Sequence, residues 1–96
     1  MKTVLFTPAA EADVREAFEW YEAQRPGLGG LFRRALDIGV GSVEQQPDAY
    51  GVVNRELRRF LLRTFPYGLY YRVMEQNIVV VACMHGKRHP TTWRSR

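Results

Sequence analysis

The sequence predicts an α+β domain in which two helices pack on one face of an antiparallel sheet. Three observations support this prediction. A short strand-like segment opens the chain, two helical segments with apolar stripes follow it, and three strand-like segments then follow in close succession. Because 96 residues suffice for one hydrophobic core, we expect a single domain over residues 1–96.

The first strand is followed by a signal that starts a helix. Residues 2–7 (KTVLFT) alternate and include β-branched side chains, as strands do. Thr7 can cap the free amides of a helix, and Pro8 suits the first helical position because it has no N–H to leave unpaired. The helix then presents one apolar stripe: Ala10, Val14, Ala17, Phe18 and Tyr21. Acidic residues fall on the opposite side: Asp13, Glu16 and Glu19.

A turn containing proline separates the two helices. Arg25-Pro26-Gly27 ends the first helix, because the residue before a proline disfavours helical geometry. We expect the second helix from Leu28 to Gln46, where a further proline stops it, so that the pair forms a helical hairpin. Gly39 lies on the apolar side of this helix, which indicates that another element approaches closely there.

Three strands are expected in the second half of the chain, forming an antiparallel meander: Arg55–Phe65, Leu69–Glu75 and Ile78–Met84. The last of these is apolar on both faces, so we expect it at the centre of the sheet and covered by the helices. The first has no clean apolar face, which predicts a bulge near Arg58–Arg59.

Charge is divided unevenly between the two halves. Residues 1–54 carry eight acidic and five basic side chains, whereas residues 55–96 carry nine basic and two acidic ones. The helical half is therefore acidic and the sheet half basic. Such a division indicates a surface that meets an anionic or acidic partner.

The composition also predicts the compartment. The single cysteine, Cys83, excludes an internal disulfide and is typical of a buried residue in a reduced protein. Acidic residues occur too early for a signal peptide. The longest apolar run, residues 78–84, is far shorter than the roughly 20 residues of a membrane helix. We therefore expect a soluble, cytoplasmic protein without a membrane association.

Arginine and tyrosine side chains are candidates for binding. Tyr70 and Arg72 share one face of a predicted strand, which we expect to be exposed, and Arg58 and Arg59 lie in the strand before it. Such a face can hold phosphates through forked hydrogen bonds and stack on bases. Alternatively, these arginines are solvated residues whose stems cover apolar surface.

The residues after the last strand are candidates for chemistry. Histidine side chains ordinarily titrate near neutral pH, so His85 could act as a general acid or base beside Arg88, or it could be a surface histidine. His85 and His89 have no nearby carboxylate or cysteine, so we expect no metal site and no cofactor. Trp20 and Trp93 could each anchor a partner or pack on the domain.

Four segments together carry a family resemblance: FTPAAEADVREAFEWYEAQRPGLGGLFRRAL, QQPDAYG, RRFLLRTFPYGLYYRV and VVVACMHGKRHPTTWRSR. They resemble the RelE/ParE superfamily of toxins from type II toxin–antitoxin modules. The likeness covers nearly the whole chain and is strongest toward the ParE-like, plasmid-stabilisation branch. It implies a RelE/ParE-like fold of one strand, a helical hairpin and an antiparallel sheet, in agreement with the elements above.

The resemblance implies a toxin that its cognate antitoxin holds inactive in a hetero-oligomer. Antitoxins of this superfamily wrap a C-terminal segment around the toxin, and such segments fold on binding. An acidic segment would suit the basic half of the chain. The candidate residues for binding the antitoxin or the target are Trp20, Arg58, Arg59, Tyr70, Arg72 and Trp93.

The resemblance leaves two mechanisms open. A ParE-like toxin inhibits DNA gyrase by protein–protein contact and blocks replication. A RelE-like toxin cleaves messenger RNA on the ribosome without a metal; here Arg63 and Arg72 would hold the phosphate, with His85 as acid or base and Arg88 in support. The RelE-like nucleases are rich in lysine, whereas this chain contains few lysines. This difference favours the gyrase mechanism. A non-toxic interaction module is a third alternative.

Overall fold

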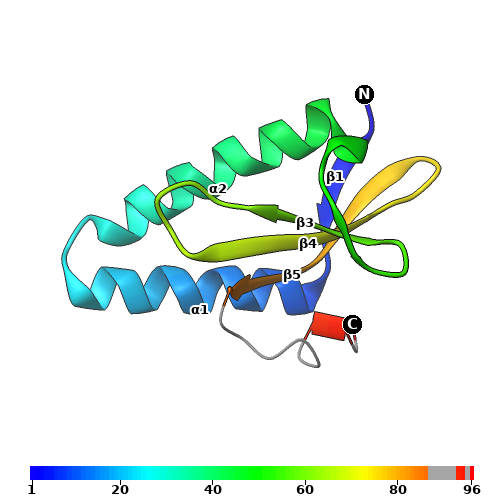
Figure 1. The fold of residues 1–96 in the computed structure, drawn as a ribbon. Coiled ribbons are helices and arrows are strands. Elements are labelled where there is room, and N and C mark those ends of the chain that lie inside the picture. Colours follow the sequence, from blue (N-terminus) through cyan, green and yellow to red (C-terminus); the bar gives the residue numbers. More distant parts are fainter. Residues whose placement is uncertain (87–92, 95) are drawn as a thin grey trace.

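Two layers make up the fold, a helical hairpin and a five-stranded sheet (Figure 1). The computed structural model describes residues 1–86, 93, 94 and 96. The elements follow in the order β1 (Thr3–Phe6), α1 (Pro8–Gln24), α2 (Leu28–Gln45), a short 3-10 helix η1 (Pro47–Ala49), β2 (Val52–Asn54), β3 (Leu57–Leu61), β4 (Tyr67–Val73) and β5 (Asn77–His85). Both helices lie on one face of the sheet, so the predicted α+β architecture is confirmed.

The hairpin begins and turns at the residues that the sequence marks. The Thr7 side chain accepts a hydrogen bond from a backbone N–H of the first turn at 3.1 Å, and Pro8 opens α1. The turn requires Gly27, whose φ of 93° is left-handed. The Glu22 carboxylate of α1 accepts from the N–H groups of Gly27 at 2.9 Å and Gly29 at 3.0 Å, and thereby caps the start of α2.

The sheet has the strand order β1-β5-β4-β3-β2. Strands β2 to β5 form an antiparallel meander, and β1 pairs in parallel with β5. The sequence did not predict β2, which pairs only with Leu57 and Arg58 of β3. A strand of three residues is too short to show an alternating pattern.

Strand β3 is shorter than the predicted strand Arg55–Phe65, because a turn bounds it on each side. Arg55 has a φ of 52° and Thr64 a φ of 64°. Both values are left-handed, which an extended strand cannot contain. The strand therefore runs only over Leu57–Leu61.

The predicted bulge near Arg58–Arg59 is not on β3 itself. Both arginines pair with β4 in regular register. The irregularity lies on the neighbouring strand β2, between Val52 and Asn54. A second irregularity makes Val81 the extra residue of β5 opposite β4.

The two faces of the sheet are buried by different partners. The face toward the helices holds the main core: Ala10, Val14, Ala17, Phe32, Leu36, Val43, Leu62, Leu69, Tyr71, Ile78, Val80 and Cys83. The opposite face holds a smaller cluster: Leu57, Tyr70, Val81, Ala82, Met84 and Trp93. Strand β5 is thus buried on both faces, as its apolar run predicts, but the helices cover only one of them.

Candidate functional site

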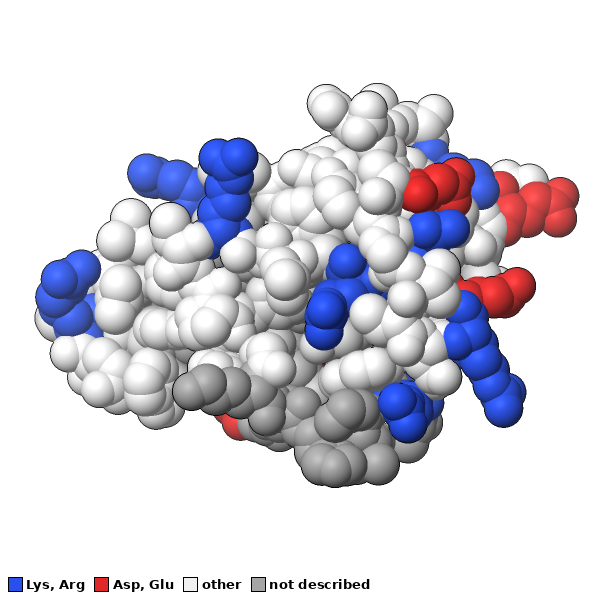
Figure 2. Space-filling model, in the orientation of Figure 1, with Lys and Arg blue, Asp and Glu red and all other residues white. Residues whose placement is uncertain are grey.

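The sheet face away from the helices carries two of the predicted arginines, and we call it the arginine face. Arg59 pairs with Tyr70, which belongs to the smaller cluster on this face, and Arg72 pairs with Val79, which packs against that cluster. Figure 2 looks onto this face: basic side chains are spread across it, whereas acidic ones gather toward one side. The predicted sharing of one face by Tyr70 and Arg72 is therefore correct.

Tyr70 is buried on the arginine face, so its predicted exposure is wrong. It is 1% exposed, and its ring stacks on that of Trp93 with 4.8 Å between centroids and 17° between planes. Trp93 is itself 5% exposed, and the Arg94 guanidinium lies 5.7 Å from its ring centroid. Two roles were open for Trp93, anchoring a partner or packing on the domain, and the structure shows the second.

Arg58 faces the helices and binds within the domain. Its guanidinium donates to the carbonyl oxygens of Asp48 at 3.2 Å and Tyr50 at 2.6 Å, and it lies 3.7 Å from the Asp48 carboxylate. Beside it, the Tyr71 hydroxyl donates to the Pro47 carbonyl oxygen at 2.7 Å, and burial raises the pKa of Tyr71 to about 12. Arg58 and Tyr71 therefore hold η1 against the sheet.

The residues of the nuclease alternative are not brought together in the described part of the chain. His85 faces the helices, because it pairs with Tyr67 and their rings lie 5.5 Å apart. Arg72 faces the opposite side and lies five positions along β4 from Tyr67, or about 17 Å. Arg63 is exposed after β3, and Arg88 lies outside the described residues.

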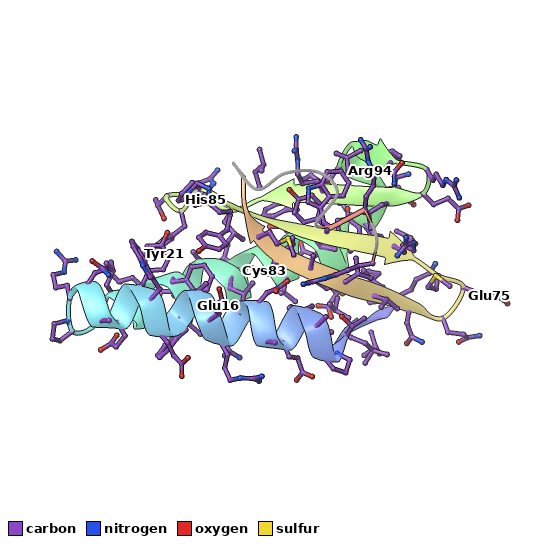
Figure 3. All side chains as sticks on the ribbon, turned by 90° about the horizontal axis from the view of Figure 1, so that it is seen from below. Glu16, Tyr21, Glu75, Cys83, His85 and Arg94 are labelled. Atoms are coloured by element: carbon purple, nitrogen blue, oxygen red, sulfur yellow. The ribbon has the colours of Figure 1, made fainter. Side chains whose placement is uncertain are left out.

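An aromatic cavity of about 540 Å³ lies between α1 and the end of β5. Trp20 and Tyr21 line it from the helix, and Tyr67 and His85 line it from the sheet; Figure 3 shows Tyr21 and His85 on these two elements. Trp20 is 57% exposed and meets Tyr21 edge-to-face at 5.1 Å. Burial raises the pKa of the Tyr21 hydroxyl. Trp20 is therefore available to anchor a partner.

Asp13 lines this cavity, so its predicted position on the outer, acidic side of the helix is wrong. Its carboxylate accepts a hydrogen bond from the Cys83 N–H at 3.0 Å and pairs with the Arg96 guanidinium. That guanidinium also donates to the Val81 carbonyl oxygen at 3.3 Å. Because β1 pairs with β5 only as far as Val80, Asp13 and Arg96 cap the edge of β5 beyond β1.

A second groove, of about 610 Å³, runs between α1, α2 and β1. Apolar side chains line it: Val4, Leu5, Phe6, Val14, Phe18 and Leu36. Charged side chains also line it: Glu11, Arg15, Arg33 and Asp37. The Thr7 N–H donates to the Val80 carbonyl oxygen at 3.0 Å, so the N–H groups of Val4 and Phe6 point away from β5. An apolar groove beside an open strand edge can take an amphipathic helix or an added strand.

Residues 1–86, 93, 94 and 96 contain neither a metal-binding cluster of side chains nor a membrane-spanning helix. Among these residues, no three His, Cys, Asp or Glu side chains gather where they could hold a metal ion. No helix of this part of the chain is both long and apolar enough to span a bilayer.

Solved toxin structures share this fold. A chain of the chromosomal ParDE toxin–antitoxin system from P. aeruginosa superposes with a TM-score of 0.79, covering 88% of this chain and 96% of that chain at 18% identity. The isolated E. coli RelE toxin superposes with a TM-score of 0.68, covering 99% and 95% at 19% identity. These likenesses establish a RelE/ParE-like fold and confirm the predicted fold class.

Sequence similarity gives the family. Residues 4–90 match the family described as the ParE toxin of the type II toxin–antitoxin system parDE. Toxin ParE2 of Mycobacterium tuberculosis (strain H37Rv) is 30% identical over 81 residues, which cover 83% of this chain and 77% of that protein. The chain therefore belongs to the ParE toxin family of type II toxin–antitoxin systems. Membership confirms the predicted resemblance and implies an antitoxin partner.

Proposed function

We propose that this chain inhibits DNA gyrase by protein–protein contact and blocks replication until its antitoxin neutralises it. Family membership supports the class of toxin. One geometric observation supports the choice of mechanism: Arg72 and His85 lie on opposite faces of the sheet. A phosphate held by Arg72 would have the whole sheet between it and His85, so these residues form no common centre for RNA cleavage.

The antitoxin would bind along the groove between α1, α2 and β1. The apolar lining and the open edge of β1 suit a segment that folds on binding. An acidic portion of that segment would reach Arg59 and Arg72 on the arginine face. Trp20 is exposed on the side of α1 that faces away from this groove, so it would contact the target or the end of the antitoxin segment.

Supercoiling and ribosome-dependent cleavage assays on one preparation test the mechanism. Expression without the antitoxin should cause filamentation and DNA-damage signalling, and the purified chain should inhibit gyrase supercoiling. His85→Ala should leave this inhibition unchanged, since His85 has no catalytic part in it. Message cleavage on ribosomes, abolished by His85→Ala and accompanied by normal supercoiling, would overturn the proposal. Harmless expression would instead point to a non-toxic interaction module.

A further inference from the structure

Four aromatic rings line the cavity between α1 and the end of β5: those of Trp20, Tyr21, Tyr67 and His85. The centroids of successive rings lie 5.1, 6.0 and 5.5 Å apart, and their planes are inclined by 84°, 61° and 70°. Rings at such steep angles form adjoining walls, in which the face of one ring meets the edge of the next. A ligand in the cavity can therefore contact aromatic rings from more than one direction.

Carboxylates complete the lining on the α1 side. Asp13 and Glu16 are three positions apart, so they share one face of the helix, and both line the cavity. Figure 3 shows Glu16 and Tyr21 along one side of α1, with Cys83 and His85 on β5 across from them. Among the described residues that line the cavity, none is a lysine or an arginine. The lining therefore combines aromatic rings with acidic side chains.

The chain itself places a guanidinium at one of these two carboxylates. Arg96 pairs with Asp13 and also donates to the Val81 carbonyl oxygen at 3.3 Å. Glu16 lies three positions further along α1, and Trp20 follows it after four more, on the same face. The Trp20 side chain is 57% exposed. A cation that enters the cavity beside Trp20 would therefore meet an aromatic ring and the Glu16 carboxylate together.

Charge and shape distinguish between the possible occupants of this cavity. The carboxylates would repel an anion or a nucleic acid. An apolar side chain could fill the space but would gain nothing from the carboxylates. Aromatic ring faces attract cations. Of the two basic side chains, arginine has a planar guanidinium that stacks on aromatic rings, donates several hydrogen bonds to carboxylates and is more weakly hydrated than the ammonium group of lysine.

We propose that this cavity binds an arginine side chain of a protein partner, with the guanidinium against the Trp20 ring and donating to the Glu16 carboxylate. This inference rests on the proposed action by protein–protein contact, because it names the kind of side chain that the partner presents. The cavity shares no lining residue with the groove proposed for the antitoxin. An arginine can therefore be bound here while that groove is occupied.

Two blocked tripeptides, Gly-Arg-Gly and the same peptide with citrulline in place of arginine, test this proposal by NMR titration of the isotope-labelled full chain. Citrulline keeps the shape of the arginine side chain but carries no charge. The arginine peptide should shift the indole N–H signal of Trp20 but not that of Trp93, which is buried on the other face of the sheet. The citrulline peptide should bind at least about five-fold more weakly. Equal binding of the two peptides, or shifts at Trp93 alone, would overturn the proposal.

A matched pair of variants separates the cavity from the general acidity of α1. Glu16→Gln and Glu19→Gln each remove one negative charge from an exposed position of this helix. Of the two positions, only Glu16 lines the cavity, so only Glu16→Gln should weaken binding of the arginine peptide, by at least about three-fold. Trp20→Ala should weaken it by at least about five-fold. Equal affinities of the two glutamine variants would show that the net charge of α1 attracts the peptide, and would overturn the proposal.

The peptide titration requires no gyrase, so its outcome is separate from that of the supercoiling assay. Binding of the arginine peptide at Trp20 by a chain that does not inhibit supercoiling would overturn the proposed function but support the arginine site. Inhibition of supercoiling by a chain that does not distinguish the two peptides would overturn the arginine site alone.

Discussion

Cys83 and Tyr71 make the stability of the fold sensitive to alkaline pH. Burial raises the pKa of each group to about 12, and the Asp13 carboxylate adds to the rise at Cys83. In the unfolded chain these groups ionise near their ordinary values of about 8.5 for cysteine and about 10 for tyrosine. The unfolded state therefore loses protons first, so the stabilising contribution is complete below about pH 8.5 and is lost as the pH rises toward about 12.

The substitution Cys83→Ala isolates the thiol part of this effect. Alanine cannot ionise in the unfolded chain, so the free energy of unfolding should fall less steeply in the variant than in the wild type between about pH 8.5 and about pH 11. Denaturant titrations at a series of pH values measure the two slopes. The thiol of the folded wild type should also react slowly with alkylating reagents, because it is 2% exposed. Parallel slopes for the two proteins would contradict this assignment.

The contacts of Asp13 with Arg96 and Cys83 could not be predicted from the local sequence. It lies three positions after Ala10 and four before Ala17, so helical periodicity does place it toward the buried side of α1. The acidic residue type instead predicts the exposed side of α1, because burying a carboxylate without a partner costs free energy. Its partners are Arg96 and the Cys83 N–H, which lie 83 and 70 positions away in the sequence. Only the tertiary fold brings these groups together.

Helix α2 packs closely at Gly39 against β3 and the residue that follows it. A Cβ at this position would lie 2.9 Å from Leu62 Cδ2 and 3.0 Å from Phe60 Cε1, whereas a Cβ at Gly41 would have no such neighbour within 4 Å. The close approach predicted for Gly39 is therefore confirmed. Gly41 faces open space, and nothing in the structure explains a glycine there.

The two glycines give a matched test of this packing. Alanine at either position should gain about 1 kcal/mol from helix propensity, so this gain cancels in the comparison. Gly39→Ala also forces Leu62 and Phe60 to move, and overpacking of this kind costs about 1–3 kcal/mol. Gly41→Ala should therefore be more stable than Gly39→Ala by about that amount. Thermal and denaturant unfolding of the two variants measure the difference, and equal stabilities would show that β3 yields without cost.

The elements differ in how much of them the sequence could predict. The second helix ends at Gln45, one residue before the predicted end, because its apolar stripe and the following proline are local signals. The bulge at Val81 has no local signal. Val79, the partner of Arg72, lies on the arginine face, and strict alternation along β5 would put His85 on the same face. The extra residue Val81 shifts the alternation by one position, so His85 faces the helices instead. The candidate nuclease residues could therefore not be placed relative to one another from the sequence.

The uneven charge of the two halves persists in the whole molecule, with a consequence for partner binding. The acidic half forms the hairpin, and the basic half forms most of the sheet, with Arg59 and Arg72 facing away from the helices. An acidic antitoxin segment would approach this face under an attractive field. Such attraction acts chiefly on the association rate and is screened by salt, because the Debye length is only about 10 Å at about 0.1 M salt.

Association of the toxin with an acidic antitoxin is therefore expected to slow steeply as salt rises from about 0.05 M to about 0.5 M. Arg59→Glu and Arg72→Glu should each slow association further and flatten its salt dependence, since each replaces attraction by repulsion on the arginine face. Arg34→Glu is the matched control, because Arg34 is exposed on α2, in the acidic half of the chain. Stopped-flow association rates and calorimetric affinities measure these effects. If all three variants slowed association equally, net charge rather than the arginine face would govern the encounter.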